Sequence, residues 1–195
     1  MNLPNQLTVG RFFLTLVFVV LLSTEWRFAN TAGLLLFAIA SVTDYLDGEI
    51  ARRRNLVTDF GKLMDPLADK IMMAAAFILL VPHHAFPAWV AIAIISREFL
   101  ITGLRLLAAS KGVVLPAEKL GKHKTIWQIV MVLYFFLLLS LDEMQTAGWF
   151  FIGTPWAYAW KIGGPLLIGV VLILTIFSGG GYVKKNWKLI TSGAM

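Results

Sequence analysis

The chain contains no cysteine, and this absence removes a whole class of structural and catalytic chemistry. Disulfide bonds, thiolate metal sites and cysteine nucleophiles are all excluded. Charged residues are also scarce, at 14% of 195 residues, whereas 58% are hydrophobic. A soluble core of this size could not hide so much apolar surface behind a polar exterior, but a lipid bilayer accepts it. The composition therefore predicts an integral membrane protein.

Six apolar stretches run along the chain, each near the roughly 17 to 25 residues that a membrane-spanning helix needs. They centre on residues 9–22, 31–46, 67–81, 88–107, 125–141 and 160–178. No internal repeat or flexible linker separates them, so residues 1–195 are expected to form one domain. We predict an all-α bundle of six transmembrane helices. Residues 1–8 mix leucine with polar neighbours and predict either a short helix on the inner leaflet or a frayed end.

Lysine and arginine predict how this bundle is oriented. Of 17 such residues, 15 belong to one side, namely Arg11 and those within residues 52–70, 97–124 and 184–188, and only Arg27 and Lys161 fall on the opposite side. The positive-inside rule therefore places both termini in the cytoplasm. The net charge of +6 comes from residues set between apolar runs. Anionic membrane lipids and phosphorylated substrates, not nucleic acid, are therefore the expected partners.

Four aspartates stand at helical spacing next to the second and third stretches. Asp44 and Asp47 are three residues apart, and Asp65 and Asp69 are four apart, so each pair is expected to share one helix face. Four carboxylates brought together at a membrane boundary repel one another, and bound cations would offset that repulsion. All-oxygen ligation favours Mg²⁺ or Mn²⁺ over zinc.

A plainer interpretation is that these acids pair with the nearby Arg52, Arg53, Arg54, Lys62 and Lys70. Two neighbouring glycines argue against it, because Gly48 and Gly61 would let a bulky ligand approach the backbone. Ala51 continues this small surface, and the forked guanidinium of Arg52 suits a phosphate. The ensemble is typical of a metal-bridged pyrophosphate site.

The same residues match, without a gap, the pattern D-x2-D-G-x2-A-R-x8-G-x3-D-x3-D over residues 44–69. This pattern is similar to the signature of the CDP-alcohol phosphotransferase family. The resemblance implies six transmembrane helices, a polar cavity that opens to the cytoplasm, a homodimer, and two divalent cations. It also implies that the donor substrate is a CDP-linked lipid such as CDP-diacylglycerol.

Roles for individual residues also follow from the resemblance. Asp44, Asp47 and Asp65 would be metal ligands, and Asp69 would both bind the second metal and act as the general base. The nucleotide of the donor would be contacted by Gly48, Ala51, Arg52 and Gly61. Thr58, placed between Arg52 and Gly61, is expected either to bind the same nucleotide or to be an ordinary loop residue.

The acceptor alcohol has to be read from other segments. Residues 95–105, 121–125 and the opening NLPNQLT resemble the bacterial inner-membrane branch of the family, whose acceptor is sn-glycerol 3-phosphate. Arg97 and Arg105 are eight residues apart, so both can face a cavity beside Lys122 and Lys124. Such a group suits a dianionic phosphate. The alternative for each is snorkelling to anionic headgroups. Glu98 is expected to orient one of these arginines.

Two other functions are weighed against this one. The first is the same chemistry with another acceptor, namely inositol phosphate, serine or phosphatidylglycerol. The second is a small cation-coupled carrier, because such carriers also hold acids inside the membrane. Carriers place these charges near mid-membrane, often in repeated halves, whereas here they gather at one interface. The sequence therefore favours the transferase.

Overall fold

The structure, a computed structural model, describes residues 3–54, 59–110, 112, 113, 115, 119–149 and 158–187. Within its helices, side chains are described except at residues 3–8, 44–54, 59–66, 69, 119, 120 and 122. The regular elements are α1 (Leu3–Leu22), α2 (Ala29–Arg54), α3 (Asp59–Leu80), α4 (Ala88–Ser110), α5 (Lys119–Thr146), the π-helix η1 (Ala159–Gly163) and α7 (Gly164–Lys185). Every regular element in this part of the chain is helical, so the predicted all-α class is confirmed.

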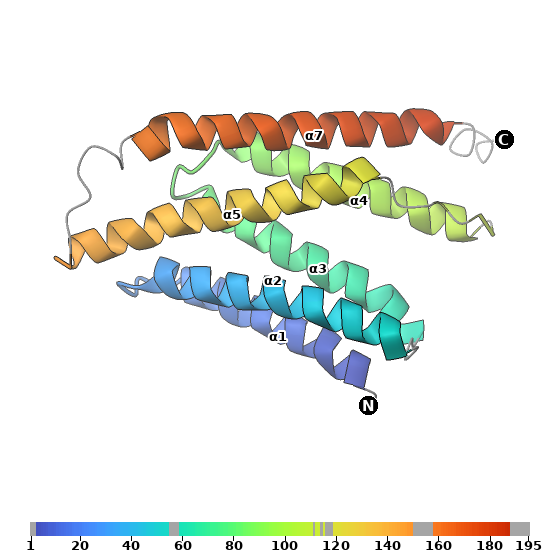
Figure 1. Ribbon diagram of the computed structural model, residues 1–195, viewed down its shortest axis with the longest axis horizontal. Helices are drawn as coiled ribbons and strands as arrows, with labels where there is room; N and C mark the ends of the chain where they lie inside the picture. Colours follow the sequence, from blue (N-terminus) through green and yellow to red (C-terminus); the bar gives the residue numbers. More distant parts are fainter. Residues whose placement is uncertain are drawn as a thin grey trace.

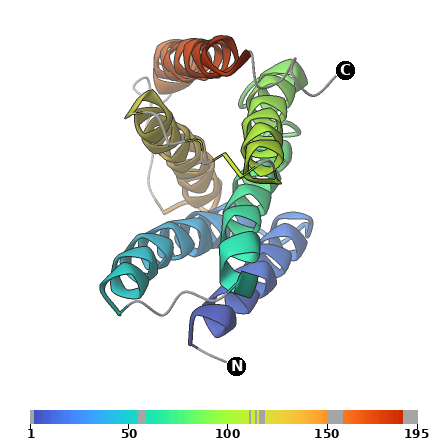
Figure 2. The same cartoon turned by 90° about the vertical axis from the view of Figure 1, so that its right-hand side faces the viewer.

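Successive helices alternate in direction. Figure 1 therefore shows the N-terminus, the end of α2, the start of α3, the end of α4, the start of α5 and the end of α7 at one end of the bundle. Helix α1 packs on α2 and α3, α5 packs on α2 and α7, and α4 packs on α7. Figure 2 looks at this end and shows α3 between α1 and α4. The predicted basic segments thus gather at a single end, together with the acidic signature.

Each predicted apolar stretch lies on one helix, apart from small differences at the ends. The sixth stretch begins in η1 and continues in α7, and Pro165 stands in the first turn of α7, where its missing N–H costs nothing. Helix α5 continues to Thr146, beyond the predicted end near residue 141. Residues 3–22 form one continuous helix, so the described part of the short N-terminal helix expected over residues 1–8 is the first turns of α1.

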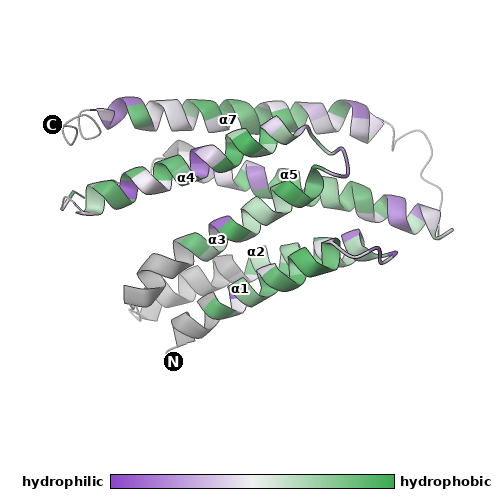
Figure 3. Ribbon diagram, turned by 180° about the vertical axis from the view of Figure 1, so that it is seen from behind, coloured by the Kyte–Doolittle hydropathy of each residue, from purple (hydrophilic) through white to green (hydrophobic). Residues whose placement is uncertain are grey.

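The outer surface of the bundle carries large apolar side chains. Phe13 is 64% exposed, Ile92 63% and Phe177 71%, on three different helices. Two segments, His123–Thr146 and Ala159–Lys185, are long and apolar enough to cross a membrane, and shorter apolar segments lie in α1, α2 and α3. Figure 3 shows α7 hydrophobic along its middle and hydrophilic toward its ends. Such a surface is stable against lipid and not against water.

An aromatic core holds the helices together. The Phe18 ring of α1 lies 6.1 Å from the Phe37 ring of α2 and 5.7 Å from the Phe136 ring of α5, measured between centroids. A second group joins α3 and α5, because the ring of Phe86 lies 6.1 Å from Phe77 and 5.6 Å from Phe135. These T-shaped and tilted contacts fix the helix spacing beneath the site.

The start of α2 is anchored by a carboxylate from α5. Glu143 accepts hydrogen bonds from the backbone N–H groups of Asn30 at 2.7 Å and Thr31 at 2.8 Å, and from the Thr31 hydroxyl at 2.6 Å. Backbone N–H groups in the first turn of a helix have no partner inside the helix, and the helix dipole favours a negative charge there. Glu143 therefore fixes the far end of the helix that carries Asp44 and Asp47.

Candidate functional site

The acidic signature lies at the end of the bundle where α2 ends and α3 begins. The backbones of Asp44 and Asp47 belong to the last three turns of α2, and those of Asp65 and Asp69 to the first three turns of α3. Arg54 and Asp59 are five residues apart, so their Cα atoms are separated by at most about 18 Å. The two acidic segments are therefore brought to one end of the molecule (Figure 1).

The signature's side chains are not among those that the structure describes, namely those of Asp44, Asp47, Ala51, Arg52, Asp65 and Asp69. The same holds for Lys122 of the predicted acceptor site, and Thr58 lies outside the described residues altogether. Among the side chains that are described, no group of three or more histidine or acidic residues could hold a metal ion. The metal ligands and the nucleotide contacts therefore stay predictions.

The predicted acceptor residues that are described gather between α4, α5 and α7. Arg97 and Arg105 come from α4 and Lys124 comes from α5, and each contacts a polar side chain of another residue. We call this group the polar cluster. Its members are Arg97, Glu98, Arg105, Lys124, Ser178 and Tyr182.

Glu98 joins two of the cations in this cluster. Its Oε1 accepts a 3.2 Å hydrogen bond from Arg97 Nη1 and forms an ion pair with Lys124 Nζ. The Lys124 side chain is only 1% exposed, and a buried ammonium is costly without a nearby opposite charge. Glu98 thus offsets that cost and orients Arg97, as the sequence predicted.

The second arginine is held by an aromatic residue of α7. Arg105 Nε donates a 3.2 Å hydrogen bond to the Tyr182 hydroxyl, and the guanidinium carbon lies 5.5 Å from the centre of the Tyr182 ring. The Tyr182 side chain is buried, whereas Arg105 is exposed. A hydrogen bond and a cation–π contact together fix an otherwise flexible side chain.

A small pocket connects the polar cluster with the signature helix. Its polar lining consists of Lys70 from α3, Glu98 from α4, and Thr125 and Gln128 from α5. Lys70 directly follows Asp69 in the sequence, so the pocket lies against the turn of α3 that carries the predicted general base. Gln128 is buried, and its Nε2 has no hydrogen-bond partner among the described atoms. Six of the ten lining residues are apolar, and the volume of about 30 Å³ has room for about one water molecule.

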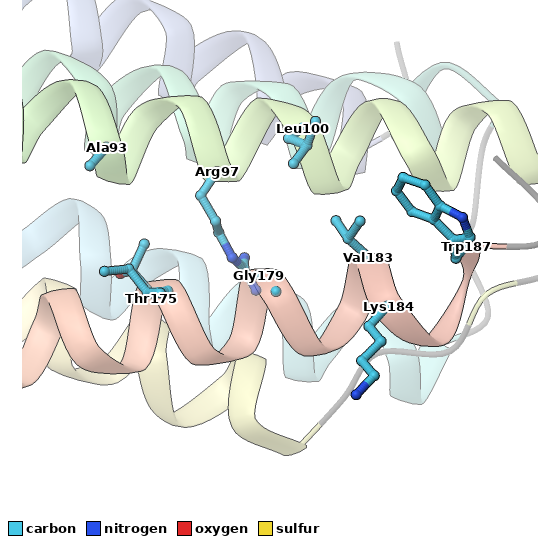
Figure 4. Close-up of a pocket in the computed structure, with 10 residues that line it drawn as sticks. Ala93, Arg97, Leu100, Thr175, Gly179, Val183, Lys184 and Trp187 are labelled. Atoms are coloured by element: carbon cyan, nitrogen blue, oxygen red, sulfur yellow. The ribbon is translucent and has the colours of Figure 1, made fainter. Parts of the chain in front are cut away.

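A mostly apolar groove of about 650 Å³ runs between α4 and α7, from Ala93 to Trp187. Figure 4 shows Arg97 pointing from α4 across this groove toward Gly179 on α7, with Lys184 and Trp187 at the end near the C-terminus. The groove places a cation beside an apolar surface. That combination suits an amphipathic ligand with an anionic group.

The described side chains of the polar cluster include three cations, Arg97, Arg105 and Lys124, and the carboxylate of Glu98. Guanidinium groups match the geometry of phosphate oxygens, so this arrangement suits a phosphate group.

Sequence reasoning missed the α7 part of the cluster. Ser178 and Tyr182 accept the hydrogen bonds that hold both arginines, yet they lie in a stretch whose composition is that of a plain membrane span. A signal was present, because both are polar, four residues apart and close to three consecutive glycines in an otherwise apolar helix. Intramembrane polar residues often mark a functional site.

Comparisons with known proteins identify the family and several relatives of this chain. Residues 1–177 match the family model described as CDP-alcohol phosphatidyltransferase. The chain is 39% identical to a protein of Bacillus subtilis over 97% of each chain, and 35% identical to one of Rickettsia typhi over 94% of this chain and 96% of the relative. A protein of Pseudomonas fluorescens is 33% identical over 96% of this chain and 91% of its own. All three relatives are CDP-diacylglycerol–glycerol-3-phosphate 3-phosphatidyltransferases.

Proposed function

Because the chain belongs to the CDP-alcohol phosphatidyltransferase family, we propose that it transfers the phosphatidyl group of CDP-diacylglycerol to sn-glycerol 3-phosphate. The products are phosphatidylglycerophosphate and CMP, so the enzyme contributes to phospholipid synthesis. The similarity covers nearly the whole length of relatives with this activity.

The polar cluster is the observation that favours a phosphorylated acceptor over serine or a neutral lipid hydroxyl, because its cations suit the dianion of a phosphomonoester. Inositol phosphate carries the same group, and the choice of glycerol 3-phosphate rests on the names of the relatives. Arg97, Arg105 and Lys124 would bind the acceptor phosphate, and Lys122, two residues before Lys124, would add a fourth cation.

The family generally depends on divalent cations, and the residues of this chain suit them. Asp44, Asp47, Asp65 and Asp69 offer only oxygen ligands, which is the donor set preferred by Mg²⁺ and Mn²⁺. Two such ions would neutralise the pyrophosphate of the donor and stabilise the departing CMP. The donor nucleotide would lie against Gly48, Ala51, Arg52, Thr58 and Gly61.

The chain's own residues would carry the remaining chemistry. The Asp69 carboxylate accepts the proton of the acceptor hydroxyl as its oxygen attacks the phosphorus of the phosphatidyl group. A new oxygen–phosphorus bond forms, and the bond between that phosphorus and the bridging oxygen breaks, so that CMP leaves with the electron pair. The polar cluster holds the acceptor by its phosphate, which fixes the hydroxyl for attack. No covalent enzyme intermediate is required.

The arrangement in the membrane completes the proposal. Six helices, α1 to α5 and α7, would span a bacterial inner membrane, with both termini and the active site facing the cytoplasm. The alternating helix directions and the gathering of basic segments at one end support this orientation. Exposed Trp26 and Trp149 near the opposite end are typical of interfacial anchors. A homodimer is proposed from family resemblance.

CMP release by the purified protein in detergent tests the function. CDP-diacylglycerol and Mg²⁺ or Mn²⁺ would be supplied with glycerol 3-phosphate, inositol phosphate, serine or glycerol as acceptor. Release should require glycerol 3-phosphate, stop when a chelator removes the metal, and resume when metal is restored. Release with another acceptor alone would overturn the acceptor assignment, and metal-independent release would overturn the role of the four aspartates.

A further inference from the structure

One face of α7 contacts both arginines of the polar cluster. Ser178 Oγ lies 3.0 Å from Arg97 Nη2 and accepts its hydrogen bond, and one turn later the Tyr182 hydroxyl accepts from Arg105. Ser178 is 2% exposed and Tyr182 3%, so the α7 side of each contact is buried. Hydrogen bonds to a charged donor are strong in such a place.

The spacing of the two helices makes these contacts converge. The Cα atoms of Arg97 and Arg105 lie about 12 Å apart along α4, whereas those of Ser178 and Tyr182 lie about 6 Å apart along α7, at about 1.5 Å rise per residue. Helices α4 and α7 run in the same direction in Figure 1, so the earlier arginine meets the earlier partner. Two well-separated arginines are thus tied to neighbouring turns of α7.

Gly179 lets Arg97 lie close to the α7 backbone. A Cβ atom at this position would stand 3.0 Å from Arg97 Cγ and 3.5 Å from its Nε, and the first distance is tighter than ordinary side-chain packing. Figure 4 shows the Arg97 side chain directed at Gly179. The stem of Arg97 therefore packs so closely on residue 179 that any other side chain there would have to displace it slightly.

We propose that Ser178, Gly179 and Tyr182 are positioning residues that hold Arg97 and Arg105 ready for the acceptor phosphate. This inference rests on the proposed function and adds α7 to the acceptor site. An arginine that is already fixed loses less freedom when the phosphate binds, so the affinity for the phosphorylated acceptor is higher. The donor nucleotide, expected against α2 and α3, gains nothing from this face.

The test measures KM for both substrates in variants of α7. Gly179→Ala and Ser178→Ala should each raise KM for glycerol 3-phosphate about tenfold, the effect of weakening one hydrogen bond to a charged group. KM for CDP-diacylglycerol should change less than about twofold, the size of effect expected of a substitution away from the donor site. Ser178→Thr, which keeps the hydroxyl, should retain most of the acceptor affinity. Tyr182→Phe removes the hydroxyl that accepts from Arg105, so it should raise KM for glycerol 3-phosphate as Ser178→Ala does.

Gly181→Ala is the matched control, because a Cβ at that exposed position meets no atom within 4 Å. It should leave both KM values unchanged. Equal rises in the two KM values, or an unchanged acceptor KM in a folded Ser178→Ala protein, would overturn the positioning role. If Gly179→Ala does not fold, the Ser178→Ala and Ser178→Thr pair decides. A wild-type protein that releases no CMP with glycerol 3-phosphate would instead refute the proposed function itself.

Discussion

Breaking the ion pair between Glu98 and Lys124 should destabilise the protein measurably. Glu98→Gln leaves the Lys124 ammonium, which is 1% exposed, without this carboxylate. Removing one partner of a fully buried pair costs about 3–5 kcal/mol. Glu98 is 22% exposed and glutamine keeps a polar oxygen, so we expect a smaller loss of about 2–3 kcal/mol in the free energy of unfolding.

A double-mutant cycle makes this prediction specific to the pair. Lys124→Met removes the ammonium, so adding Glu98→Gln to it should cost much less than Glu98→Gln alone, with a coupling energy of about 1–3 kcal/mol. The assay is denaturant unfolding in detergent micelles, followed by circular dichroism. Glu25→Gln, at an exposed position in the turn after α1, serves as the control and should change little. Single effects that simply add would refute the coupling and, with it, the role of Glu98 as the counter-charge.

Three further predictions concern other parts of the chain. Asp69→Asn should abolish CMP release while binding of CDP-diacylglycerol remains measurable by calorimetry, and undiminished turnover would remove Asp69 from proton transfer. Glu143→Ala removes the carboxylate that caps α2 and should lower unfolding stability by about 1–3 kcal/mol, whereas the exposed neighbour Asp142→Ala should not. Burial lowers the pKa of His83 from its ordinary 6.5, with Glu143 opposing and His84 adding to the shift. Below about pH 6.5 the unfolded chain therefore binds more protons than the folded one, so the stability present above pH 6.5 should fall as the pH drops from 6.5 through the lowered pKa. His83→Gln should flatten this dependence of stability on pH in thermal unfolding, and an unchanged slope would contradict the prediction.

Local patterns in the sequence were enough for the class of fold. Hydrophobic runs of helical length predicted every described helix, because each apolar face is a property of one segment and needs no knowledge of its neighbours. The fixed spacing of residues 44–69 indicated the family for the same reason. Helix ends were less predictable, as the extension of α5 to Thr146 shows.

Part of the candidate site was also visible in the sequence. Arg97, Arg105 and Lys124 were expected near one another; the structure joins Arg97 and Lys124 through Glu98, while Arg105 contacts Tyr182, one turn of α7 after the partner of Arg97. The four aspartates stay predictions, because the described side chains do not include theirs. The arginines could be predicted because a charged residue inside an apolar helix is visible in the sequence of that one helix.

The sequence by itself determined that this is a helical membrane protein with the signature of its family, whereas only the tertiary structure decided which residues are partners. Arg97 and Ser178 are 81 residues apart, Arg105 and Tyr182 are 77 apart, and Glu143 reaches Asn30 across 113. No local periodicity encodes such pairs, because they depend on how helices cross and which faces meet. In the sequence, Ser178 is one polar residue in an apolar span. It accepts a hydrogen bond from Arg97, which we expect to bind the acceptor phosphate, only because α4 packs against α7.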